Sequence, residues 1–76
     1  MPGITLDRAP LRLPLVLQDA TGAGTIRRLA ALGLRRGAEV TLLHNTSGGG
    51  RVALVGGTRV ALGPGVLKQV QVEVAS

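Results

Sequence analysis

Few residues of this chain could carry out acid–base or nucleophilic chemistry. The sequence holds one histidine, four carboxylates and no cysteine. Nucleophilic catalysis needs a hydroxyl or thiol beside a general base that a third group orients. Ser47 is close in sequence to His44, but it lies in a glycine run, and nothing supplies an orienting carboxylate on a rigid element. We therefore expect no catalytic residues and no enzymatic activity.

The same histidine is the one candidate metal ligand. A specific metal site needs three or four converging ligands, and the absence of cysteine excludes a thiolate cluster. His44 could ligate an ion if an aspartate or glutamate completed the site. A lone histidine near a strand end is far more often an ordinary side chain, so we expect no cofactor.

Two glycine-rich stretches could be read as phosphate-binding loops. Thr21–Thr25 precedes a helical pattern, and a helix N-terminus favours anions. It lacks the third glycine of a dinucleotide motif and the Lys-Ser/Thr of a P-loop. Ser47–Gly50 lies between two strands instead of before a helix. Both stretches are better explained as structural turns.

Two pairs of arginines are the sharper signal. Arg27 and Arg28 fall on the polar face of a short helix, and Arg35 and Arg36 follow in the next turn. Such a basic ridge could bind an acidic protein surface or a phosphate backbone. Barrels that bind single strands stack bases on aromatic side chains, and this chain has none, so we expect no nucleic acid partner. Arginine is enriched at protein–protein interfaces.

We therefore predict that this helix and the turn after it bind a protein partner. The predicted contact residues are Arg27, Arg28, Leu32, Leu34, Arg35 and Arg36. Packing in the core is the simpler explanation for the two leucines.

The helix that presents the arginines is short. Thr25 is the predicted N-cap, although the helix could begin a few residues earlier. An apolar stripe runs from Ile26 through Leu29 to Gly33 at helical spacing, with Leu32 beside it. Gly33 is placed where a helix ends in the left-handed conformation, with Leu34 folding back on the last turn. The structural turn residues are predicted as Gly33, Gly37, Gly56 and Gly57.

The remaining elements are strands, because apolar and polar residues alternate. We expect a first strand over 11–18 with a leucine face, at an edge or bulged where Pro14 cannot donate a ladder hydrogen bond. Further strands are predicted over 39–45, 51–55, 58–62 and from Val70 to Val74. The Gly56–Gly57 pair suits a two-residue hairpin turn. A helical turn is expected over 66–68.

These elements predict a mainly β fold, a partly open barrel of about five strands with one short helix inserted after the first strand. Its 76 residues make one domain, with 1–10 as a loose lead-in to a barrel over 11–76. Hydrophobic residues make up 45% and charged residues 17%, which argues against disorder. Without aromatics, the core is built from small aliphatic side chains.

Composition also bears on the compartment and on partners. No stretch has the roughly 20 apolar residues of a membrane span, and Arg12 and Pro14 interrupt the only apolar patch that resembles a signal peptide. We expect a cytoplasmic protein. The net charge of +5 favours acidic partners. The uncertain edge at 11–18 leaves a strand-mediated homo-oligomer open.

Three segments of the chain together match a family pattern. The run Arg27–Val40, the Gly56–Leu62 strand and the valine-rich last strand resemble the ferrous iron transport protein A (FeoA) family over about residues 10–75. The resemblance implies an SH3-like barrel with an inserted helix. The Gly63–Gly65 stretch and the flexible segment Gly22–Gly24 depart from the usual family pattern.

The resemblance also implies a function. Family members are small cytosolic, non-enzymatic proteins that contact the cytosolic, GTPase-bearing part of the membrane ferrous iron transporter, ferrous iron transport protein B. The protein would then meet the membrane only through the transporter. Two alternatives remain: a small basic nucleic-acid-binding barrel, and the SH3-like domain of a metal-dependent repressor.

Overall fold

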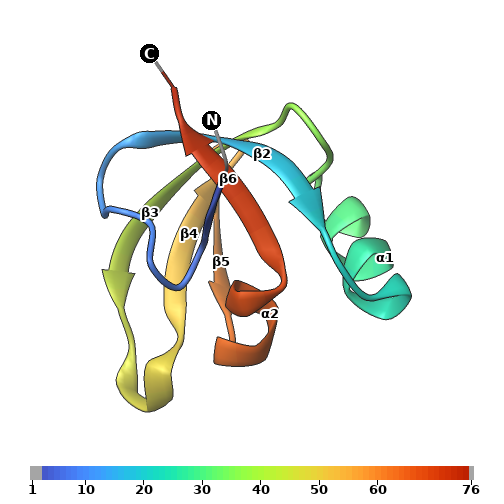
Figure 1. The fold of residues 1–76 in the computed structure, drawn as a ribbon. Coiled ribbons are helices and arrows are strands. Elements are labelled where there is room, and N and C mark those ends of the chain that lie inside the picture. The colour runs from blue at the N-terminus through green and yellow to red at the C-terminus, as the bar shows by residue number, and fades with distance from the viewer. Residues whose placement is uncertain (1–2, 76) are drawn as a thin grey trace.

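The computed structural model describes residues 3–75. The six strands among them form one antiparallel sheet in the order β1-β6-β2-β3-β4-β5. The strands curl around a common interior, and a helix lies beside the end of β2 (Figure 1). The strands are β1 (Ile4–Thr5), β2 (Pro14–Ala20), β3 (Glu39–Asn45), β4 (Arg51–Val55), β5 (Thr58–Leu62) and β6 (Val70–Val74). The helices are α1 (Ala23–Ala31), the 3₁₀ turn η1 (Ser47–Gly49) and α2 (Pro64–Lys68).

The core is made of leucine, valine and alanine side chains from nearly every element. Alternation along the strands sends one apolar face inward. Its members, all nearly or fully buried, are Leu6, Ala9, Leu15, Leu17, Leu29, Leu34, Val40, Leu42, Ala53, Val55, Leu62, Leu67, Val70 and Val72. Small branched side chains of this kind fill the narrow interior of a small barrel.

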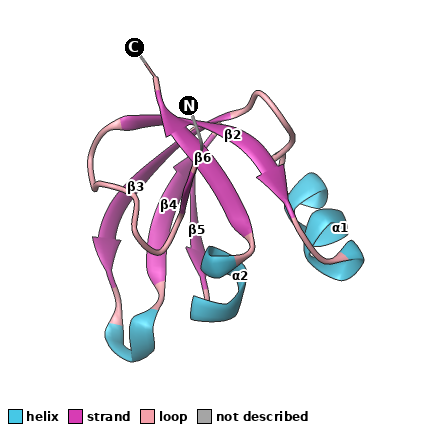
Figure 2. Ribbon diagram, viewed as in Figure 1, coloured by secondary structure: helices cyan, strands magenta, loops and turns pink. Residues whose placement is uncertain are grey.

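The strands on either side of the two hairpin connections match their predicted bounds. β3, β4 and β5 span 39–45, 51–55 and 58–62. Gly56 and Gly57 both have positive φ, 56° and 82°, which confirms the predicted two-residue turn. Figure 2 shows the helical turn η1 at the tip of the β3–β4 hairpin. In this part of the chain, the apolar–polar alternation and the turn residues predict the same strand bounds, and the structure confirms them.

The first long strand begins later than predicted. β2 starts at Pro14, and Leu13, expected on the leucine face, is 43% exposed. Arg12 has a positive φ of 63° and its N–H donates to the Leu42 oxygen at 2.7 Å, so the chain is still turning there. Pro14 is tolerated as the first residue of a strand.

β2 is also not an edge strand, because β6 and β3 pair with its two sides. The expectation of an edge or a bulge at Pro14 is therefore wrong. The irregularity in the pairing of β2 with β6 lies between Leu17 and Asp19 instead.

The segment expected to be a loose lead-in is part of the fold. β1 pairs with β6, and Leu6 and Ala9 are buried in the core. The Arg51 guanidinium donates to the backbone oxygens of Leu6 at 2.9 Å and Ala9 at 2.6 Å. The two buried apolar side chains and the two hydrogen bonds from Arg51 hold the segment 4–9 against the barrel.

Helix α1 begins before the predicted cap. It starts at Ala23, after Gly22 with a φ of 87°, and the Thr25 hydroxyl donates to the Gln69 side-chain oxygen at 2.5 Å instead of capping. Its end is as predicted. Gly33 has a φ of 88°, and the Leu34 N–H donates to the Leu29 oxygen at 2.7 Å, the six-to-one bond of a glycine-terminated helix.

The C-terminal part confirms a helical turn near 66–68. Pro64 opens α2 as its first residue, where its missing N–H costs nothing, and Leu67 is buried. Along β6, Val70 and Val72 are buried as predicted, but Val74 is exposed where the strand leaves the barrel.

Candidate functional site

Helix α1 leaves a groove on each of its two sides. The first, which we call the α1–β2 groove, has a volume of about 210 Å³. It is bounded by the end of β2, by α1 and by the turn after α1, and its lining is Leu17, Asp19, Ala20, Ile26, Leu29, Ala30, Leu34, Arg35 and Arg36. Residues from three separate segments therefore meet at this place.

The α1–β2 groove has an apolar floor and a charged rim. Leu17, Leu29 and Leu34 belong to the core and form the floor. Ile26 is 48% exposed, so it offers apolar surface to a partner. Arg35 supplies a cation beside it. An apolar patch next to guanidinium groups is a composition typical of protein interfaces.

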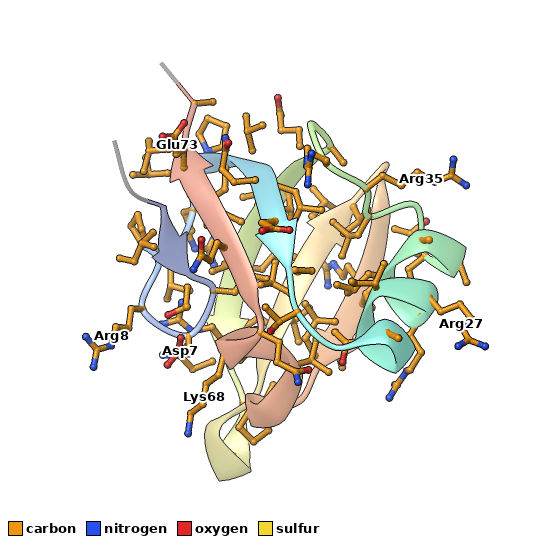
Figure 3. All side chains as sticks on the ribbon, turned by 45° about the vertical axis from the view of Figure 1, so that its right-hand side comes forward. Asp7, Arg8, Arg27, Arg35, Lys68 and Glu73 are labelled. Carbon is orange, nitrogen blue, oxygen red and sulfur yellow. The ribbon has the colours of Figure 1, made fainter. Side chains whose placement is uncertain are left out.

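The charged side chains of this rim are exposed, and the ion pair between them is weak. An Arg36 Nη2 lies 3.7 Å from the Asp19 Oδ1, and the two side chains are 80% and 62% exposed. Such an exposed pair contributes little to stability, on the order of 0–1 kcal/mol. Arg35 extends away from the barrel (Figure 3). Both guanidinium groups are therefore free to pair with a partner at small cost.

The structure divides the predicted contact residues instead of gathering them. Arg35 and Arg36 line the α1–β2 groove, whereas Arg28 and Leu32 line a small cavity of about 40 Å³ between α1 and the end of β5. Arg27 extends from α1 into solvent (Figure 3).

Leu34 is the one predicted contact residue that the structure contradicts. It is 2% exposed, because the turn at Gly33 folds it back over the barrel interior. It lies in the floor of the α1–β2 groove and offers almost no surface to a partner.

The second groove, the α1–β5 groove, has a larger volume of about 750 Å³. It lies between the end of α1 and the strands β3, β4 and β5. Its lining is Ala31, Leu32, Gly33, Ala38, Glu39, Thr41, Leu54, Val55, Gly56, Gly57, Thr58 and Val60. Three of the four predicted turn glycines border this groove. Gly37, the fourth, has a φ of 88° and its N–H donates to the Leu17 oxygen at 2.8 Å.

Sequence reasoning missed Ile26 as a surface residue. It shares a helical stripe with Leu29, which is buried, so the pattern predicts that both face the core. No sequence signal separates the two, because only the placement of α1 against the barrel decides which one is covered.

The structure gathers no chemical centre around His44. The side chain is exposed, and its Nδ1 lies 3.2 Å from the Asn45 backbone oxygen. Within residues 3–75, no three histidine, cysteine, aspartate or glutamate side chains lie close enough to hold a metal ion. Between the same limits, no helix is long and apolar enough to cross a membrane.

One carboxylate has a perturbed pKa, and it lies away from both grooves. A hydrogen bond from the Thr5 hydroxyl lowers the pKa of Asp7, and the charges of Arg8 and Lys68 act in the same direction against partial burial. These charged side chains lie together on the side of the molecule opposite α1 (Figure 3). Asp7 Oδ1 is buried without a hydrogen-bond partner among the described residues, and this charged cluster is separate from the candidate site.

Comparison with known proteins adds a family match. The family model described as the FeoA domain matches residues 4–74. No curated protein matched this sequence.

Solved structures share the fold. FeoA from Stenotrophomonas maltophilia, solved with zinc and described as an SH3 domain protein, is 32% identical with a TM-score of 0.77, over 92% of this chain and 89% of that one. A FeoA-like protein from Clostridium acetobutylicum is 19% identical with a TM-score of 0.85, over 100% of this chain and 91% of that one.

The same fold occurs within a longer protein. The manganese-activated repressor ScaR in its apo form is 20% identical with a TM-score of 0.85, over 95% of this chain but only 35% of the repressor. The predicted SH3-like barrel is thus confirmed, and the same barrel occurs both in FeoA proteins and within a metal-responsive repressor.

Proposed function

This chain belongs to the FeoA domain family, and we propose from that membership that it is a non-enzymatic accessory protein of ferrous iron uptake, acting by protein–protein contact in the cytoplasm. The family is associated with ferrous iron transport and is not a known enzyme family. The Stenotrophomonas maltophilia FeoA is itself described as a candidate ferrous iron transport activating factor. The match over residues 4–74 supports the same role for this chain.

The partner in this proposal is the cytosolic, GTPase-bearing part of the ferrous iron transporter, ferrous iron transport protein B. The observation that carries the proposal is the α1–β2 groove, where Ile26 exposes apolar surface beside Arg35 and Arg36. Arginines at the margin of an apolar patch fix the orientation of a partner, while the apolar residue supplies contact area. The net charge of +5 speeds the approach of an acidic partner surface.

The proposal is tested by capture of the transporter's purified cytosolic domain on the immobilised full chain. A double variant, Arg35→Glu and Arg36→Glu, reverses the rim charges, and Ile26→Ser removes the apolar contact. Each lost surface ion pair is worth up to about 1 kcal/mol, so the loss of two pairs should weaken binding by up to about thirtyfold. The loss should shrink as salt rises, because salt screens exposed charges.

A matched control variant has the same net charge as the Arg35→Glu, Arg36→Glu double variant. Arg8→Glu with Arg12→Glu makes the same change at two exposed arginines outside the α1–β2 groove, and it should bind as the unchanged chain does. If both double variants bind as tightly as the unchanged chain, the groove is not the contact surface. If the unchanged chain itself captures no transporter domain, the proposed function is wrong.

A second candidate function is that of the SH3-like domain of a metal-dependent repressor. The structural likeness to ScaR favours it, since this chain matches about a third of that repressor. The size of the native gene product decides: a product of the present 76 residues supports the accessory protein, and a product several times longer supports the repressor domain. An immunoblot of the source cells measures this directly.

A further inference from the structure

Strand β5 forms one edge of the sheet, and its outer side has no strand partner within residues 3–75. It pairs only with β4, and the two-residue turn Gly56–Gly57 sets the register. The residues that flank such a turn exchange hydrogen bonds, and the bonding then alternates along the ladder. The backbone groups of Thr58, Val60 and Leu62 are therefore used on β4. Those of Arg59 and Ala61 point away from the sheet.

The outer backbone groups of β5 are open to a ligand. Both Arg59 and Ala61 are exposed. Across residues 3–75, no backbone hydrogen bond outside the sheet ladder involves either residue. An open edge of this kind is a template for another strand.

The α1–β5 groove provides space and apolar surface beside this edge. It has a volume of about 750 Å³, and Val60 and Thr58 of β5 line it opposite Leu32 of α1. Leu32 is 42% exposed, a large apolar side chain that the fold leaves uncovered. When an extended peptide adds to a sheet edge, backbone hydrogen bonds supply affinity and pockets for alternate side chains supply specificity.

The charges near the outer edge of β5 favour one kind of binding segment over another. Arg59 stands on the edge strand itself, and Arg28 borders the small cavity at the end of β5 together with Ala61. Neither forms an ion pair among the described residues. Glu39 is the one carboxylate in the lining of the α1–β5 groove. A second copy of this chain would bring another Arg59 and another net charge of +5 to the edge, whereas an acidic segment would neutralise both arginines.

We propose that the outer edge of β5 binds an extended acidic segment of a partner protein as an additional strand. The segment pairs with the backbone of Arg59 and Ala61, its apolar side chains contact Leu32 and Val60, and its carboxylates pair with Arg28 and Arg59. About five residues suffice to span the strand, at roughly 3.3 Å per residue. That the segment belongs to the iron transporter rests on the proposed function; the binding mode does not.

The test uses the full chain labelled with ¹⁵N and a blocked hexapeptide of alternating glutamate and valine. We expect the amide signals of Arg59 and Ala61 to shift on titration, and their hydrogen exchange to slow, while strand β1 is unaffected. A hexapeptide of alternating lysine and valine should bind at least about tenfold more weakly, because it presents like charges to both arginines.

Two variants separate backbone pairing from charge. Ala61→Pro removes an outward N–H that β4 does not use, and it should abolish binding, with Ala61→Val as its size control. Arg59→Glu should weaken binding about fivefold, the equivalent of about 1 kcal/mol for an exposed pair. Arg27→Glu makes the same charge change on α1 at a residue that lines neither groove, and it should bind as the unchanged chain does. Arg59→Glu leaves the backbone intact, so the proposal stays testable if Ala61→Pro fails to fold.

Three results would overturn the proposal: no shifts at Arg59 and Ala61, equal binding of the lysine peptide, or shifts that follow the protein's own concentration without peptide. The last result would make a second copy the occupant. These outcomes are independent of the transporter capture experiment. If the transporter domain is captured through Arg35 and Arg36 while the peptide fails to bind, only the β5 proposal is wrong.

Discussion

Replacing Leu6 by alanine tests whether the N-terminal segment is part of the core. The Leu6 side chain is 0% exposed, and its backbone is held by two further contacts. Its N–H donates to the Val70 oxygen at 2.9 Å, and its carbonyl accepts from Arg51 at 2.9 Å. Both contacts use backbone atoms of Leu6, so the variant removes side-chain packing alone.

The expected loss is large for a domain of this size. Truncating a fully buried leucine to alanine costs about 2–5 kcal/mol, the transfer free energy of the lost methyl groups plus the cavity that they leave. At roughly 0.05–0.15 kcal/mol per residue, a chain of 76 residues has a free energy of unfolding of about 4–11 kcal/mol. The variant therefore loses a substantial part of its total stability.

Urea unfolding followed by far-ultraviolet circular dichroism measures the loss, because the chain has no tryptophan or tyrosine for fluorescence. With a denaturant slope of about 1 kcal/mol per molar, the midpoint should fall by about 2 M or more. Leu13→Ala is the matched control: it deletes the same atoms from a side chain that is 43% exposed, and should cost less than about 1 kcal/mol. Equal midpoints for the two variants would refute the assignment of Leu6 to the core.

Two more expectations concern backbone conformation and pH. Gly24→Ala should raise the free energy of unfolding by about 0.5–1 kcal/mol, because the residue lies within α1 and an added Cβ meets nothing within 4 Å. Gly33→Ala should lower it by about 1–2 kcal/mol, because its φ of 88° strains any L side chain; urea midpoints that shift in the same direction would contradict this contrast. A hydrogen bond and neighbouring cations lower the pKa of Asp7 in the folded state. Ionised Asp7 therefore stabilises the fold at pH values above its pKa in the unfolded chain. This stabilisation is lost as the pH falls through the lowered pKa of the folded state. The urea midpoint of the unchanged chain should therefore fall more steeply under acid than that of Asp7→Asn, and parallel profiles would exclude this role.

The candidate site was only partly predictable. The sequence places Arg35 and Arg36 in the turn after the helix, and they do border a groove. It could not predict that Asp19 would lie beside Arg36, since the two are joined only through the packing of β2 against that turn. The predicted ridge of four arginines is in fact divided by α1, because Arg28 turns toward β5.

The local structure of the β3–β5 strands and of the end of α1 was determined by the sequence itself. The β3, β4 and β5 strands follow from alternation, the turn between β4 and β5 follows from two glycines that tolerate positive φ, and the end of α1 follows from Gly33. These features depend on residues close together in the chain, whose preferences can be summed without knowing the fold.

Burial and proximity were decided only by the tertiary structure. Leu6 is covered because β1 pairs with β6 at the other end of the chain, and Leu34 is covered while Ile26 is exposed because of where α1 rests on the barrel. The open outer side of β5 likewise follows from strand order and not from the residues of β5. Each of these outcomes is set by contacts between residues far apart in sequence, and no local preference encodes such contacts.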